Sequence, residues 1–92
     1  MFSFVKHSRF QKAYEKLIQK NKEVESRIEK TLDLMIENPR HPGLKTHKIV
    51  TKKNKTVRSS WVHGDLRIIW QFNKGEIQII DLLDLGNHGQ VY

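Results

Sequence analysis

The stretch that decides the fold is residues 57–72, VRSSWVHGDLRIIWQF. Polar and apolar side chains alternate on both sides of His63-Gly64, and a period of two is typical of strands whose two faces differ. One face of the second half carries only apolar side chains, which are Leu66, Ile68, Trp70 and Phe72. Because glycine allows a tight turn, the stretch predicts an antiparallel hairpin with one buried face and with Arg67 on the opposite, exposed face.

Strand patterns continue on both sides of this hairpin. Residues 45–51 are weakly strand-like and lead into a turn at 53–55. A tight turn at 73–75 precedes residues 76–85, the most apolar of the predicted strands. Phe2-Ser3-Phe4 also alternates and predicts a short first strand.

Two helices are predicted between the first strand and the later ones. Apolar residues recur at helical spacing from Arg9 to Gln19, after a capping box formed by Ser8 and Gln11. Asn21 is the expected cap of the second helix, and Asn38-Pro39 ends it because the residue before proline disfavours helical backbone. The short link between the helices predicts an antiparallel helical hairpin.

The order of elements predicts one α+β domain over residues 1–92. Its N-terminal strand and helical hairpin would pack on a twisted, mainly antiparallel sheet of four to five strands. The chain has no cysteine, which excludes a disulfide framework and a zinc–thiolate site. No run reaches the ~18–20 apolar residues of a membrane span, and the N-terminus has no secretory pattern. We therefore expect a cytoplasmic protein with no membrane segment.

Charge indicates the class of partner. Lys and Arg number 17 against 10 acids, for a net charge of +7, which favours a polyanion or an acidic protein over a merely basic soluble domain. Residues 38–64 contain no Asp or Glu. The predicted RNA-backbone contacts in and around this stretch are Lys45, Lys48, Lys52, Lys53, Lys55 and Arg58.

Three segments carry a family resemblance: PRHPGLK at 39–45, WVHGDLRIIW at 61–70 and GNHGQVY at 86–92. Together with the order of elements, they resemble the RelE/ParE superfamily of bacterial toxins, above all the YafQ- and HigB-type members. The resemblance implies a microbial-ribonuclease-like fold and cleavage of messenger RNA in the ribosomal A site. It also implies a cognate antitoxin that neutralises the toxin.

Cleavage of RNA by its own 2′-hydroxyl needs groups that move protons, for which histidine is suited by a pKa of about 6.5. Matched against the family patterns, the catalytic candidates are His47, His63, Asp65, Arg67, His88 and Tyr92. His88 and His47 are expected to share the proton transfers. His63 is an alternate, two positions beyond Trp61, where the YafQ pattern has another histidine.

The other candidates would bind the substrate. Arg67 matches an arginine that contacts the scissile phosphate region in the RelE and HigB branches, and with Arg58 it would stabilise the phosphate. Tyr92 would stack on or position a base, and Trp61 joins the lysines as an RNA contact. Asp65 matches the acidic residue of the YafQ pattern. We expect no metal or cofactor, because no histidine pair has metal-ligand spacing.

Three functions compete at this point. The leading one is the toxin of a type II toxin–antitoxin system acting as a metal-independent mRNA endonuclease. The second is a ParE-type toxin that poisons DNA gyrase without nuclease chemistry, and the third is a non-toxic relative that only binds its antitoxin. The expected partners are an antitoxin with an acidic or amphipathic segment, messenger RNA and the ribosome. Operator DNA would be bound through the antitoxin.

Overall fold

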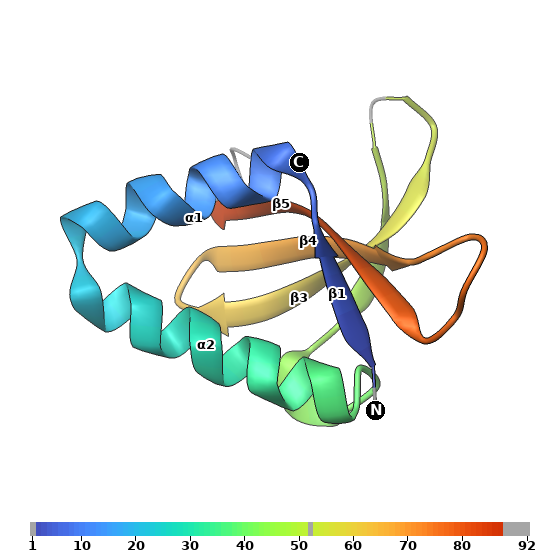
Figure 1. The fold of residues 1–92 in the computed structure, drawn as a ribbon, viewed down its shortest axis with the longest axis horizontal. Coiled ribbons are helices and arrows are strands. Elements are labelled where there is room, and N and C mark those ends of the chain that lie inside the picture. Colours follow the sequence, from blue (N-terminus) through green and yellow to red (C-terminus); the bar gives the residue numbers. More distant parts are fainter. Residues whose placement is uncertain (1, 52, 88–92) are drawn as a thin grey trace.

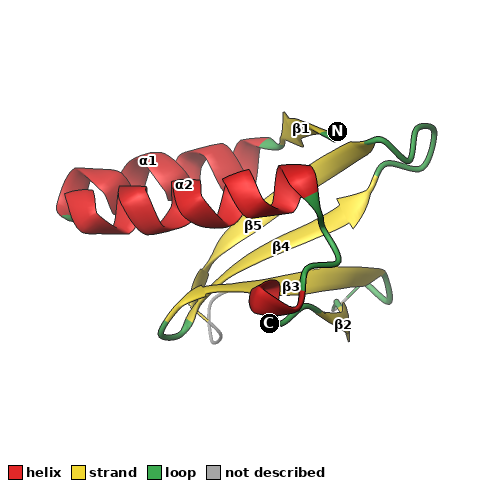
Figure 2. Cartoon of the chain, turned by 90° about the horizontal axis from the view of Figure 1, so that it is seen from below, coloured by secondary structure: helices red, strands yellow, loops and turns green. Residues whose placement is uncertain are grey.

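The computed structural model describes residues 2–51 and 53–87. A five-stranded sheet in the order β1-β5-β4-β3-β2 is covered on one face by a helical hairpin (Figures 1 and 2). The elements are β1 (Ser3–Lys6), α1 (Ser8–Lys20), α2 (Lys22–Glu37), the 3-10 turn η1 (Pro42–Leu44), β2 (His47–Val50), β3 (Thr56–His63), β4 (Leu66–Phe72) and β5 (Ile79–Asn87). The strands from β2 to β5 are antiparallel neighbours, and β1 pairs with β5 in parallel. The predicted α+β fold is confirmed.

The main core lies between the sheet and the two helices. Helix α1 contributes Phe10, and α2 contributes Ile28, Leu32 and Met35. The sheet contributes apolar residues of β3, β4 and β5, which are Val62, Leu66, Ile68, Trp70, Ile80, Leu82 and Leu85. The predicted face of β4 therefore points at the helices. Each large apolar side chain buried in this way contributes about 1.5–3 kcal/mol to folding.

The two helix starts differ in how well the sequence predicted them. Asn21 caps α2 as expected, because its Oδ1 accepts a hydrogen bond from the Glu23 N–H at 2.9 Å. The capping box of Ser8 and Gln11 is wrong: Ser8 is already helical, and His7 is the N-cap without a side-chain capping bond. The His7 N–H donates to the Leu82 carbonyl at 3.0 Å, so pairing with β5 sets where the strand ends and the helix begins.

The last strand is shifted from its predicted bounds of 76–85. Asn73 Oδ1 accepts from the N–H groups of Gly75 and Glu76, and the Glu76 carbonyl accepts from the Ile79 N–H. These bonds hold residues 73–78 in a turn, so β5 begins only at Ile79. It continues to Asn87 because its far end pairs with Leu66 and Arg67 of β4.

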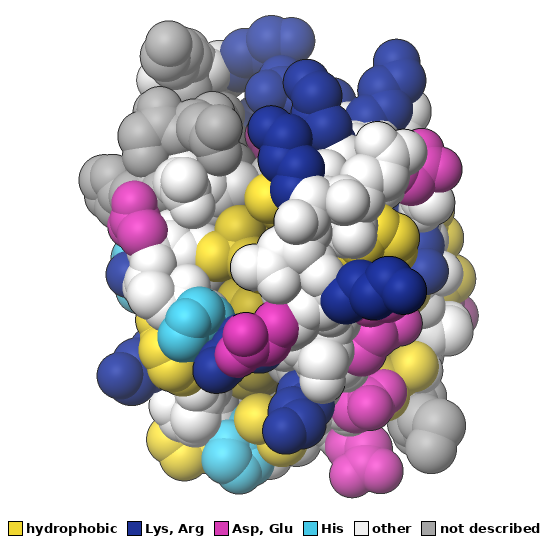
Figure 3. Space-filling view, turned by 90° about the vertical axis from the view of Figure 1, so that its left-hand side faces the viewer, with side chains coloured by type: hydrophobic (Ala, Val, Ile, Leu, Met, Phe, Trp, Pro, Cys, Tyr) yellow, Lys and Arg dark blue, Asp and Glu magenta, His cyan; other side chains and the backbone are white. Residues whose placement is uncertain are grey.

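Charge is divided between the two helices. Helix α1 carries Arg9, Lys12, Lys16 and Lys20 against one acid, whereas α2 carries five acids against three cations. Figure 3 shows a dense group of Lys and Arg side chains at the top of that view, whereas most Asp and Glu side chains lie in its lower part. The basic character of the chain is therefore uneven over its surface.

Candidate functional site

The register of β2, β3 and β4 separates the predicted site residues onto two faces of the sheet. His47 lies opposite Ser59, and Trp61 lies opposite Arg67. These side chains, with Ile69, define what we call the open face because it is turned away from the helices. The face is not fully exposed as predicted, since Ser59 and Ile69 are buried. Lys48 lies opposite Arg58, and both point to the helix side. A single basic run in the sequence thus supplies two different surfaces, because side chains alternate along a strand.

Arg67 is the central cation of the open face. It lies between Trp61 on β3 and Gly86 on β5, and its side chain is half-buried. Its Nε is buried and has no hydrogen-bond partner among the described residues. A buried donor without an acceptor costs about 1–3 kcal/mol. An anionic oxygen bound beside Arg67 would remove that cost.

Trp61 is held at the end of the β3–β4 hairpin by two contacts. Its indole N–H donates to the Gly64 carbonyl at 2.9 Å, and Lys45 Nζ lies 4.8 Å from the centroid of its ring. Gly64 has a φ of 55°, a left-handed conformation that glycine adopts without a Cβ penalty. Lys45, which directly follows η1, and Trp61 of β3 are both predicted RNA contacts and are therefore neighbours in space.

His63 and Asp65 are exposed at the same turn. The pairing register shifts between Trp61 and His63, because His63 pairs with Leu66 after Trp61 has paired with Arg67. This irregularity interrupts the alternation by which His63, two residues after Trp61, would lie on the same face of the sheet as Trp61. Three predicted site residues, Lys52, His88 and Tyr92, lie outside the described residues.

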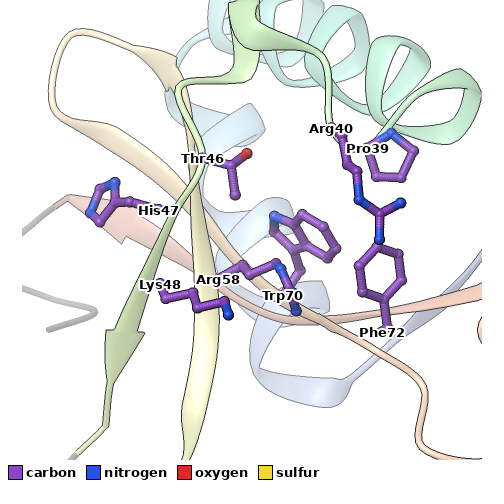
Figure 4. Close-up of a pocket in the computed structure, with 8 residues that line it drawn as sticks. All are labelled: Pro39, Arg40, Thr46, His47, Lys48, Arg58, Trp70 and Phe72. Atoms are coloured by element: carbon purple, nitrogen blue, oxygen red, sulfur yellow. The ribbon is translucent and has the colours of Figure 1, made fainter.

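A pocket of about 320 Å³ lies on the helix side of the sheet, beside β2. Its lining consists of Pro39, Arg40, Thr46, His47, Lys48, Arg58, Trp70 and Phe72. Figure 4 shows the side chains of Arg58 and Lys48 on one side of β2 and the ring of His47 directed to the other. His47 therefore borders the pocket while its ring belongs to the open face.

The pocket has two guanidinium groups held against aromatic rings. Arg58 Cζ lies 4.9 Å from the Phe72 centroid and 5.6 Å from the Trp70 centroid. Arg40 Cζ lies 5.2 Å from the same Phe72 ring. Such cation–π contacts contribute about 0.5–1 kcal/mol when exposed and more when desolvated. Sequence patterns had predicted Arg58 but had not selected Arg40 or Phe72, which come from separate elements and share no motif.

A buried chain of hydrogen bonds fixes the back of this pocket. The Trp70 indole N–H donates to Ser60 Oγ at 2.7 Å, and Ser60 Oγ lies 2.6 Å from Thr46 Oγ1. Ser60 and Trp70 are both nearly inaccessible to solvent. The chain ties the segment before β2 to the middle of β4, so it sets the distance between the two walls of the pocket.

The two carboxylates of β5, Asp81 and Asp84, form hydrogen bonds or ion pairs with other side chains. Burial raises the pKa of Asp81, but hydrogen bonds from Asn73 and Gln71 and the nearby His7 outweigh it and lower the pKa below its usual value. Arg9 pairs with Asp84 at 3.1 Å. Neither carboxylate is paired with Arg67 in the described part of the chain.

Two further features of the described residues concern possible metal and membrane sites. These residues contain no group of three His, Cys, Asp or Glu side chains placed to hold a metal ion. In residues 2–51 and 53–87, neither α1 nor α2 has the length and apolar character needed to cross a membrane.

The architecture matches that of solved bacterial toxins over the whole chain. YafQ from E. coli superposes with a TM-score of 0.76 at 19% identity, covering 100% of this chain and 99% of that one. A chain of the E. coli DinJ–YafQ toxin–antitoxin complex gives 0.74 at 18% identity, covering 99% and 97%. A YoeB/ParE toxin from Agrobacterium tumefaciens gives 0.76 at 10% identity, covering 95% and 99%.

No family model and no curated protein sequence matches the chain. The likeness is therefore one of fold, shared at low sequence identity. The predicted RelE/YafQ-type toxin fold is confirmed by it.

Proposed function

We propose that this chain is the toxin of a type II toxin–antitoxin system and that it cleaves messenger RNA at the ribosome without a metal ion. The observation that carries the proposal is the open face. In it Arg67, whose buried Nε has no hydrogen-bond partner within residues 2–51 and 53–87, lies on the same side of the sheet as His47 and Trp61. The toxin fold shared over the full chain supports it.

The chemistry assigns different work to these side chains. Arg67 would stabilise the charge that develops on the phosphate, where oriented cations are often the largest contribution to catalysis. His47 would take or give a proton, together with His88, and Tyr92 would position a base. Lys45, held over the Trp61 ring, would bind the RNA backbone beside the turn.

The test is induction of the chain in the absence of any antitoxin. Growth should stop, and cut messages should have ends at defined codon positions. Replacement of Arg67 by Gln should slow cleavage by roughly 10²-fold or more, as loss of an oxyanion donor does. The exposed Lys16→Gln variant of α1 is the matched control and should stay toxic. Normal growth with intact messages would refute the proposal.

The ParE-type alternative has one specific observation in its favour. Trp61 stands where the YafQ pattern has a histidine, and its bond to Gly64 and its contact with Lys45 keep it in place. A gyrase poison needs no histidine pair. If His88→Ala stays fully toxic and the purified protein blocks DNA supercoiling, the nuclease proposal is wrong. Absence of any growth effect would instead favour a relative that only binds its antitoxin.

A cognate antitoxin is the proposed protein partner. The match to the DinJ–YafQ toxin–antitoxin complex supports this. Co-expression of the neighbouring small open reading frame should restore growth and should yield a complex that purifies together. Sequence-specific binding of operator DNA should require the antitoxin, so in the presence of excess competitor DNA the toxin alone should not shift an operator fragment in a gel.

A further inference from the structure

The pocket beside β2 gathers cations without a matching acid. Its lining contains Arg40, Lys48 and Arg58 and no carboxylate. None of the three forms an ion pair with a described Asp or Glu. Lys48 and Arg58 are direct cross-strand partners, and like charges in that position destabilise a sheet. The fold therefore keeps a repulsive arrangement that a bound anion would relieve.

The rings of the pocket orient the guanidinium groups. Phe72 contacts both Arg40 and Arg58, and Trp70 contacts Arg58 as well. A guanidinium held against a ring loses little further side-chain freedom when it binds, and its planar set of N–H groups matches the oxygens of a phosphate. Because both rings are in contact with arginine side chains, they are less available to stack on a base. The pocket is therefore suited to an oxyanion more than to a stacked base.

We propose that this pocket binds a phosphate of a nucleic-acid strand, as a second anion site on the opposite side of the sheet from Arg67. Its volume of about 320 Å³ is at the lower end for ligand pockets, which suits one phosphodiester unit. Where the strand is messenger or ribosomal RNA, this rests on the proposed function. The affinity of the pocket itself does not depend on cleavage.

The surroundings favour a nucleic acid over an acidic protein segment. Lys53 and Lys55 lie in the turn between β2 and β3, and both are exposed. They continue the positive charge of Lys48 along the same hairpin, and a regular row of phosphates can use each of them. Because β2 is the edge strand, an RNA that leaves the pocket across it reaches the open face beside His47.

The experiment measures binding of a short fluorescein-labelled RNA in which every 2′-hydroxyl is methylated, so that it cannot be cleaved. Fluorescence anisotropy is recorded over a series of salt concentrations. Arg40→Gln should reduce the slope of log K against log salt by about 0.7, which is the loss of one phosphate contact on a single strand. Affinity at 0.1 M salt should then fall about fivefold.

Two variants complete the design. Lys16→Gln on α1 removes an exposed cation far from the pocket in the sequence and should leave slope and affinity unchanged. Arg58→Lys keeps the charge but loses the planar guanidinium, so affinity should fall while the slope is kept. Circular dichroism of each variant checks that the fold is intact.

Unchanged RNA binding by both Arg40→Gln and Arg58→Lys would overturn the inference. A labelled hexaglutamate peptide distinguishes the acidic-protein alternative: if Arg40→Gln weakens only peptide binding, the pocket is not a phosphate site. The proposed function is tested separately, by whether the protein cleaves messenger RNA. If the protein cuts no message but Arg40→Gln still weakens its binding of RNA, the pocket is a phosphate site and the nuclease proposal is wrong.

Discussion

Removal of the Ser60 hydroxyl is a direct test of how the pocket is built. In Ser60→Ala the Trp70 indole N–H loses its acceptor at 2.7 Å, while both residues remain buried. A buried donor left without an acceptor costs about 1–3 kcal/mol. Thr46 also loses its partner, but it is half-buried and can turn toward water. We therefore expect a loss of about 2 kcal/mol in the free energy of unfolding.

The assay is urea unfolding followed by far-ultraviolet circular dichroism. With an m-value of about 1–3 kcal/mol per molar urea, the midpoint should fall by roughly 1 M. In thermal unfolding, each kcal/mol corresponds to about 4–8 °C for a domain of this size. Ser26→Ala on the exposed side of α2 is the matched control and should change stability by less than about 0.5 kcal/mol.

A double-mutant cycle identifies the bond itself. Trp70→Phe keeps an aromatic ring and removes the N–H, so Ser60→Ala should cost much less in that background. The two substitutions should be non-additive by about 1 kcal/mol or more, as residues in direct contact are. Additive effects, or a cost below about 0.5 kcal/mol for Ser60→Ala alone, would refute the assigned hydrogen bond.

Three further predictions concern stability. The pKa of Asp81 is lower in the folded than in the unfolded protein, where it is about 3.9. Asp81 therefore stabilises the fold above that pH, and this stability is lost as pH falls through the pKa of the folded state. Asp81→Asn should flatten the acid side of a curve of unfolding free energy against pH. Asn21→Ala should cost about 1 kcal/mol in urea unfolding, through loss of the cap of α2. Gly64→Ala should cost about 1–2 kcal/mol because of its φ of 55°, and Gly64→Asn should cost less; equal costs would contradict the backbone explanation.

The sequence predicted the hairpin of β3 and β4 and which side chains share a face, because side chains alternate along a strand. The prediction that the face opposite the helices is exposed was only partly right, since Val57, Ser59 and Ile69 on that face are buried. Leu66, Ile68 and Trp70 point to the helices and Arg67 points away, as the period of two requires. The alternation of side chains does not determine the order of the strands in the sheet. Nothing in the pattern of Phe2-Ser3-Phe4 indicates that the first strand pairs in parallel with the last.

The candidate site was predicted in composition but not in arrangement. The basic run of residues 38–64 was predicted to bind anions, which stays a prediction. Its division between the two faces depends on the register that sets His47 against Ser59 and Lys48 against Arg58. The pocket needs Arg40 after α2 and Phe72 at the end of β4, which only tertiary structure brings together. The roles assigned to all the site residues stay predictions, and His88 and Tyr92 lie outside the described residues.

The position of β5 in the sheet affects when the protein can fold during its synthesis. This strand is the last element of the described chain, yet it lies inside the sheet between β1 and β4, and α1 packs on it. During synthesis the early strand and helices must wait for residues 79–87 before their shared core can close, and such distant pairings fold slowly. An unfinished chain would therefore lack the sheet that carries Arg67. On the proposed function, a growing chain would therefore gain its activity only after residues 79–87 are free to pair with β1 and β4.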